Sequence, residues 1–220
     1  ALSGNESGLK GAETVTVLGG SATVSEALSI QGVSGYQDAA SSYDIVDAAS
    51  VLAVVCNTEI GDAGVGEVIA SDTATASEGA AINALTGDAT FDVSDSAQAI
   101  ADALSGNESA LEDAGTVTVL GGSATVSEAI SIQGVSGYQD AASSYDIVDS
   151  ASVVAGTSVD VGGDRIIVKV IASDTATASE GAAMNALTVD ATSAVSDSAQ
   201  VMADALSGYA FAPEDAWTVN

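Results

Sequence analysis

The chain has 220 residues, of which 31 are acidic, three are basic and none is histidine, so its formal net charge is −28. Nucleic acids and anionic lipid surfaces need clustered Lys and Arg, and this composition excludes both as partners. Hydrophobic residues make up 47 % of the chain, yet no apolar stretch reaches the roughly 18 to 20 residues that a membrane span requires. We therefore expect no membrane insertion.

The sequence consists mainly of a tandem repeat of two copies. Residues 1–102 match residues 103–204 without a gap, and a partial third copy occupies residues 205–220. Residues 29–47 are identical to residues 131–149, so loops are repeated as faithfully as apolar positions. A repeat of this kind is typical of proteins whose fold is built from stacked copies of one unit. We predict one domain-sized copy of four short β-α units, a second such copy, and a third segment that is a C-terminal cap or a subunit joint.

Each unit of the first copy opens with a few β-branched or aromatic residues, a composition typical of short strands. The four predicted strands cover residues 14–17, 43–46, 67–70 and 90–93.

A helix-start signal follows each predicted strand. Two of these signals have the spacing of a capping box, in which a hydroxyl and a carboxylate each bind a backbone N–H: Thr23 with Glu26 and Thr75 with Glu78. The other two helices have candidate N-caps at Asp47 and at Asp95, the latter together with Ser94.

The runs after these signals have helical periodicity. Apolar residues recur at i, i+3, i+4 and i+7 in residues 48–55 and 97–104, so each helix has one apolar stripe to bury. Gly32, Gly87 and Gly106 follow three of the runs, where a left-handed residue would end a helix.

The order β-α-β-α with short connections predicts parallel strands joined by right-handed helical crossovers. We predict an α/β solenoid of short β-α units, with a parallel sheet on one side and helices on the other. The alternative is a pair of tandem immunoglobulin-like β-sandwiches of about 100 residues each. The Ala-rich amphipathic runs and the repeated capping boxes favour the solenoid.

Two regions differ between the copies. Residues 54–67 diverge densely from residues 156–169, which is typical of a drifting surface loop or of a partner-specific patch. The last twelve residues bring in aromatic side chains and the only proline, and solenoids need atypical terminal units. The residues predicted to close this end or to dock against a further subunit are Tyr209, Phe211, Pro213 and Trp217.

No catalytic constellation stands out. Without histidine the chain lacks the usual general base, and its serines follow no nucleophile-elbow motif. Cys56 is the only cysteine and its counterpart is Ser158, so no intramolecular disulfide is possible. We predict a protein that is not an enzyme and requires no cofactor.

Calcium is the ligand that this composition suits best, because carboxylates and carbonyls bind hard cations. Asp44, Asp92 and Asp146 occupy equivalent strand positions, and each alternates away from the aromatic residue before it. They would form a row along one face, as calcium ligands or as a solvated acidic ladder. The sequence has neither an EF-hand loop nor the Gly-rich calcium nonapeptide, which favours the ladder.

Two phrases carry a resemblance, Val-Ile-Ala-Ser-Asp-Thr-Ala-Thr-Ala-Ser-Glu at 68–78 and Tyr-Asp-Ile-Val-Asp-Ser-Ala-Ser-Val at 145–153. They resemble the Ala/Thr/Asp-rich repeats of very large secreted surface proteins, hemolysin-type or adhesin-like, of cyanobacteria and marine bacteria. The resemblance implies a secreted or cell-surface location and a structural role.

The expected function is a non-enzymatic structural repeat protein. It would assemble with itself end to end into a filament, surface layer or matrix, or form a stiff segment of a larger surface protein. The alternative is an adhesin or binding module that recognises a glycan, a mineral or a cell surface, with calcium as a conceivable cofactor.

Overall fold

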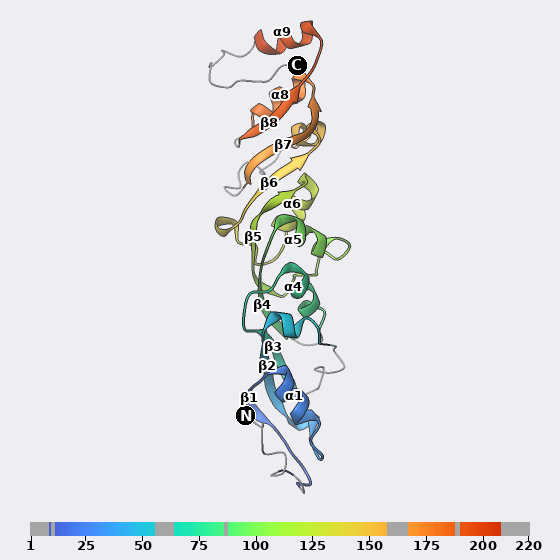
Figure 1. Ribbon diagram of the computed structural model, residues 1–220, viewed down its shortest axis with the longest axis vertical. Coiled ribbons are helices and arrows are strands. Elements are labelled where there is room, and N and C mark those ends of the chain that lie inside the picture. Colours follow the sequence, from blue (N-terminus) through green and yellow to red (C-terminus); the bar gives the residue numbers. More distant parts are fainter. Residues whose placement is uncertain are drawn as a thin grey trace. The chain divides into compact units, whose positions relative to one another are not determined.

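The computed structural model describes most of the chain as alternating strands and helices (Figure 1). The described residues are 9, 12–55, 64–85, 88–157, 167–187 and 190–207. The strands are β1 (Leu18–Ala22), β2 (Ser42–Asp47), β3 (Val65–Ala70), β4 (Asp88–Asp95), β5 (Ala114–Ala124), β6 (Ser144–Asp149), β7 (Ile167–Ala176) and β8 (Ala191–Val195). The α-helices are α1 (Val24–Gln31), α2 (Ala49–Leu52), α4 (Ala76–Asn83), α5 (Ala97–Leu104), α6 (Val126–Gln133), α7 (Ala151–Gly156), α8 (Ala178–Asn185) and α9 (Ala199–Ser207), with short 3₁₀ turns at Asp38–Ala40 and Asp140–Ala142.

The described strands form an eight-stranded parallel sheet whose order follows the chain, from β1 to β8. Parallel neighbours cannot be joined by a tight hairpin, so a crossover connection, usually a helix, must link each strand to the next. The predicted α/β class is confirmed, and a parallel sheet alternating with helices is incompatible with the β-sandwich alternative.

The chain divides into two compact regions that do not coincide with the two sequence copies. The first comprises residues 1–94, 103–117 and 135–138, and the second comprises residues 95–102, 118–134 and 139–220. In the first region, Figure 1 shows α1 and α4 on the same side of their strands.

The core of each region lies between the sheet and the helices. In the first region Tyr43, Ile45 and Phe91 point inward from their strands and are at most 2 % exposed. The helices contribute mainly small and aliphatic side chains, among them Leu52 and Ile82. A thin core of this kind explains how a chain rich in Ala and Val can bury enough apolar surface.

Three of the four predicted strands of the first copy are confirmed, since residues 43–46, 67–70 and 90–93 lie within β2, β3 and β4. The prediction for residues 14–17 is wrong. Val15 forms a single bridge to Tyr36 and the Val17 carbonyl accepts from the N–H of Ser42, but the strand β1 begins at Leu18. In the second copy the counterpart segment lies within β5, because β4 precedes it and supplies a neighbour.

The predicted helix ends are confirmed in part. Gly106 has a φ of +81°, the left-handed conformation expected after a helix, whereas Gly32 has a φ of −72° and stays right-handed. The left-handed residue after α1 is Gly35, with a φ of +84°. Gly87 lies outside the described residues.

Gly79 sits inside α4, where a glycine normally weakens a helix. A Cβ added there would lie 2.8 Å from Cγ2 of Val93 and 3.0 Å from Cε2 of Phe91. The glycine therefore lets the helix approach the sheet closely enough to cover the Phe91 ring.

We expect Gly79→Ala to lower the free energy of unfolding by about 1 kcal/mol. The gain in helix propensity is about 1 kcal/mol, and overpacking costs typically about 1 to 3 kcal/mol. Val93 is β-branched and cannot swing aside at low cost. Urea denaturation checks the effect. The matched control is Gly181→Ala in α8, where Ser193 replaces the Phe91 ring. If the Gly79→Ala protein is more stable than wild type, the close packing of α4 on the sheet does not limit residue 79.

Candidate functional site

The first feature that repeats along the structure is the capping box at the helix start. It is present at α1, α4, α6 and α8, which confirms both predicted boxes and adds their counterparts in the second copy. At α6 the Glu128 carboxylate accepts from the Thr125 N–H at 2.7 Å and from the Thr125 hydroxyl at 2.9 Å. The Glu128 N–H donates to the Thr125 hydroxyl at 3.3 Å. The box satisfies two backbone donors that the helix itself cannot.

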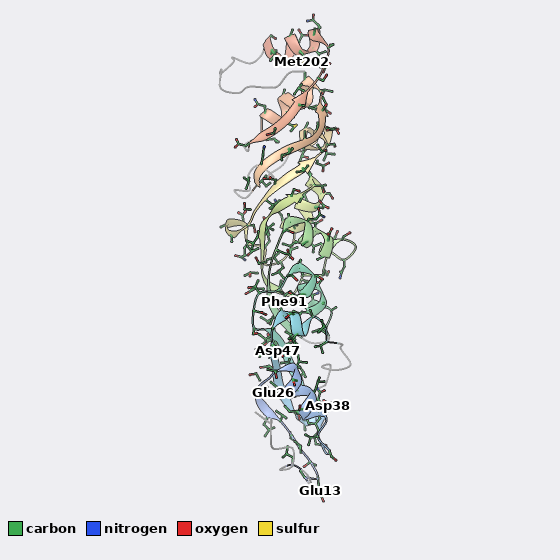
Figure 2. All side chains as sticks on the ribbon, in the orientation of Figure 1. Glu13, Glu26, Asp38, Asp47, Phe91 and Met202 are labelled. Carbon is green, nitrogen blue, oxygen red and sulfur yellow. The ribbon has the colours of Figure 1, made fainter. Side chains whose placement is uncertain are left out.

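At α1, an aspartate from the next β-α unit also binds the start of the helix. Asp47 ends β2, and its Oδ2 accepts from the N–H of Val24, the first residue of α1, at 3.1 Å. Its Oδ1 accepts from the N–H of Ala48 at 2.9 Å. One side chain thus ties the end of its own strand to the preceding helix; Asp47 is labelled in Figure 2. We call this arrangement an aspartate clasp.

The bond from an aspartate to the first residue of a preceding helix recurs along the described chain, and we use the name clasp for this bond. Asp149 and Asp197 also accept from the residue that follows them, as Asp47 does. Asp72 accepts from Ala49 at 2.7 Å, and Asp149 accepts from Val126 at 3.1 Å. The remaining two clasps are Asp174 on Ala151 at 2.6 Å and Asp197 on Ala178 at 3.3 Å. In four of the five clasps the partners lie 23 residues apart, which is one β-α unit.

The clasps correct the prediction that Asp47 is the N-cap of the helix that follows it. The N-cap of α2 is Ala48, which has no side-chain capping bond, and Asp47 serves α1 instead. At α5 the capping hydroxyl is that of Ser96, which accepts from the N–H of Ala99, and Asp95 accepts from the N–H of Ser96. The candidate N-cap at Asp95 therefore lies one residue too early.

A negative charge beside the first residues of a helix is electrostatically favourable. The first N–H groups of a helix carry partial positive charge, so a carboxylate beside them is stabilised. The backbone N–H of Thr125, which donates to Glu128, lowers the pKa of that carboxyl below its ordinary value, and partial burial opposes the shift. The backbone N–H of Thr23 likewise lowers the pKa of Glu26.

We expect the stability that Glu128 contributes to depend on pH. Because its folded pKa is lowered, the contribution is present above the ordinary glutamate value of about 4.3 and is lost as the pH falls through the folded pKa. Glu128→Gln should therefore be less stable than wild type at pH 7, and the two proteins should converge only as the pH falls through the lowered folded pKa of Glu128. Urea unfolding at several pH values measures this, with the exposed Glu108→Gln as control. A difference that does not vary with pH would contradict it.

The structure does not bring the predicted calcium residues together. Asp44 lies on β2 and Asp92 on β4, with β3 between them, and the register makes Ile45 level with Val68 and Ala89, so Asp92 is also displaced along the strand. The two aspartates are therefore more than about 10 Å apart. Calcium ligands lie at about 2.3 to 2.6 Å, so one ion cannot contact both. Asp92 instead accepts from the Thr116 hydroxyl at 2.7 Å. Asp146, in the second region, is in register with Lys169 of β7.

Within the described part of the chain, no group of three carboxylate, cysteine or histidine residues is placed to hold a metal ion. The same part contains no helix that is long and apolar enough to cross a membrane. The predicted assembly residues Tyr209, Phe211, Pro213 and Trp217 lie outside it, as does Cys56.

The divergent segment is described only at its ends, and these ends differ in charge. Glu67 of β3 accepts a hydrogen bond from the hydroxyl of Thr90 on β4. Its counterpart in the second copy, Lys169, faces Asp146 on the neighbouring strand. The two copies therefore present opposite charges at the same place on the sheet.

Comparison with protein-family models, with curated proteins and with solved structures gave no match for this chain.

Proposed function

We propose that this chain is a non-enzymatic, extracellular structural repeat protein whose β-α units form a stiff solenoid. It assembles end to end into a filament, surface layer or matrix, or it forms a stiff segment of a larger surface protein. The observation that carries the proposal is the recurrence of one clasp, strand to preceding helix, at five helix starts. The same contact would join any further unit to the stack.

The sheet supports assembly because its strand order is open. Among the described strands, β1 and β8 stand at the two ends of the order. An edge strand presents unpaired N–H and C=O groups that can pair with another chain. Two different ends give a head-to-tail interface that need not close, which is the geometry of a filament.

The net charge of −28 supports regulation of this assembly by cations. Surfaces of like charge repel each other, and salt screens the repulsion over about 10 Å at 0.1 M ionic strength. The secreted or cell-surface location remains part of the proposal and rests on the resemblance of the repeats to those of large surface proteins.

Negative-stain electron microscopy of the purified chain tests the proposal, with millimolar calcium and separately with a chelator. We expect regular filaments or sheets, more abundant with calcium. A variant that combines Asp44→Asn, Asp92→Asn and Asp146→Asn shows whether the acidic ladder is responsible for any calcium dependence. Isolated particles under both conditions would contradict autonomous assembly and favour an adhesin or binding segment.

A further inference from the structure

The place where the first sequence copy meets the second shows how one strand is received by another. In the sheet order β5 lies next to β4. In the first region the Thr116 hydroxyl donates to Oδ1 of Asp92 at 2.7 Å, and a Cβ at Gly115 would lie 3.2 Å from the same oxygen. The strand beside Asp92 therefore has a glycine where the carboxylate leaves little room.

In the second region, the segment that follows contacts the start of α5. A Cβ at Gly122 would lie 3.4 Å from Cβ of Ser96, and the Gln98 side chain hydrogen-bonds the Glu128 carboxylate. The apolar stripe of α5 is at most 6 % exposed at Ala97, Ile100, Ala101 and Leu104. Residues 116–129 are thus the segment that lies on β4 in one region and on α5 in the other.

The same receiving surface recurs at β8 and α9 without a described neighbour. Residues 190–204 keep 11 of the 15 residues of the 88–102 segment. Among the described strands none follows β8, and no residue of α9 is buried. Leu206, the counterpart of the buried Leu104, is 41 % exposed. This end therefore presents an apolar stripe and a strand edge that its counterpart covers.

The segment that would cover it is present at the other end of the strand order. Residues 14–27 are identical to residues 116–129 at all fourteen positions. Val117 and Val119 are completely buried, whereas their counterparts Val15 and Val17 are only half-buried. The described part of the chain gives β1 a neighbour on one side alone, β2.

Two substitutions make these ends fit each other. Glu13 stands where the second copy has Gly115, and Ala194 stands where the first copy has Asp92; both side chains are exposed. If β8 had kept the aspartate, a strand that carries Glu13 would bring two carboxylates together, and like charges on neighbouring strands repel. The acceptor lacks the carboxylate where the incoming strand gains one.

We propose that β8 and α9 of one chain bind residues 14–27 of a second copy, in the register of β5 on β4. Thr14 of the second copy lies beside Ala194, and its Glu26 lies near Gln200, the counterpart of Gln98. This inference rests on the proposed end-to-end assembly and specifies the interface through which it occurs.

A disulfide trap between two different chains tests this register. One chain carries Ala194→Cys, the other carries Thr14→Cys, and both carry Cys56→Ser to remove the native thiol. Neighbouring strands lie about 4.8 Å apart, within the Cα separation that disulfides accept. With millimolar calcium present to screen the charge, we expect a rapid mixed disulfide between the two chains. The matched control, Ser196→Cys mixed with Thr14→Cys, should form it much more slowly.

Microscopy of the same samples separates this inference from the proposed function. Filaments without the mixed disulfide would overturn the inference and leave end-to-end assembly standing. The mixed disulfide without filaments would support the inference and contradict extended assembly. Equal cross-linking of the trap and the control, or none in either, would also overturn the inference.

Exchanging the two substituted positions gives a second readout by sedimentation velocity. We expect Ala194→Asp to weaken self-association several-fold, because it places a carboxylate beside Glu13 of the second copy. Adding Glu13→Gly should restore association by recreating the Asp92 and Gly115 pair. Adding the exposed Glu108→Gln instead removes the same charge elsewhere and should not restore it. Equal rescue by both second changes, or by neither, would overturn the proposed register.

Discussion

Gly137→Ala should lower the free energy of unfolding by about 3 kcal/mol. Gly137 has a φ of +81°, and an added Cβ would lie 2.8 Å from the carbonyl oxygens of both Ala114 and Gly115. The left-handed conformation costs an L residue roughly 1 to 2 kcal/mol. The clash adds to this cost, because both oxygens belong to backbone at the start of β5 and cannot move independently. Urea denaturation followed by circular dichroism measures the loss.

Gly106→Ala separates the cost of the left-handed conformation from the cost of the steric clash. Gly106 has the same φ of +81°, but an added Cβ would meet no atom within 4 Å. It should therefore lose only the conformational part, about 1 to 2 kcal/mol. Equal losses in the two variants would mean that the close approach of residue 137 to β5 contributes nothing.

Asp149→Ala should cost about 2 kcal/mol. The Asp149 carboxylate accepts from the N–H of Val126 at 3.1 Å and from the N–H of Ser150 at 2.7 Å. Removing it leaves two partly buried donors without this acceptor and removes negative charge from the start of α6. Asp149→Asn keeps an acceptor but not the charge, and it should lie between Asp149→Ala and wild type. Urea unfolding of the three proteins measures the order.

The matched control is Asp146→Ala on the same strand. It removes the same charge from β6 but lies outside the clasp, so we expect a change within about 0.5 kcal/mol. If Asp146→Ala destabilises the protein as much as Asp149→Ala does, general charge rather than the clasp is responsible.

The parts of the fold that depend on neighbouring residues could be predicted from the sequence. Thr23 and Glu26 are three residues apart, and their capping box needs no information from elsewhere in the chain. The alternation at Tyr43 and Asp44 likewise predicts which side chain is buried, and Tyr43 is 2 % exposed.

The parts that depend on the next unit could not be predicted in this way. Asp47 has the same local sequence signal whether it caps the helix after it or the helix before it. Its partner Val24 lies 23 residues away, so only the stacking of units reveals the clasp. A signal was present, since an aspartate recurs 23 residues after the first residue of four of the five clasped helices, as Asp72 does after Ala49.

The acidic residues of one strand also have different roles according to the face they occupy. Asp146 and Asp149 are three positions apart on β6, so alternation places them on opposite faces. Asp149 reaches a helix start, whereas Asp146 lies beside Lys169 on the neighbouring strand. Composition alone, with 31 acidic residues, cannot separate structural carboxylates from a solvated ladder.

Amide hydrogen exchange on the intact chain tests the central claim, that carboxylates hold each β-α unit to the one before it. First-turn amides of a helix normally lack an intrahelical acceptor and exchange quickly. The five clasped amides, Val24, Ala49, Val126, Ala151 and Ala178, should instead be protected as strongly as the sheet amides of the same region. Exchange at these five positions at the rate of an unstructured peptide would contradict the account.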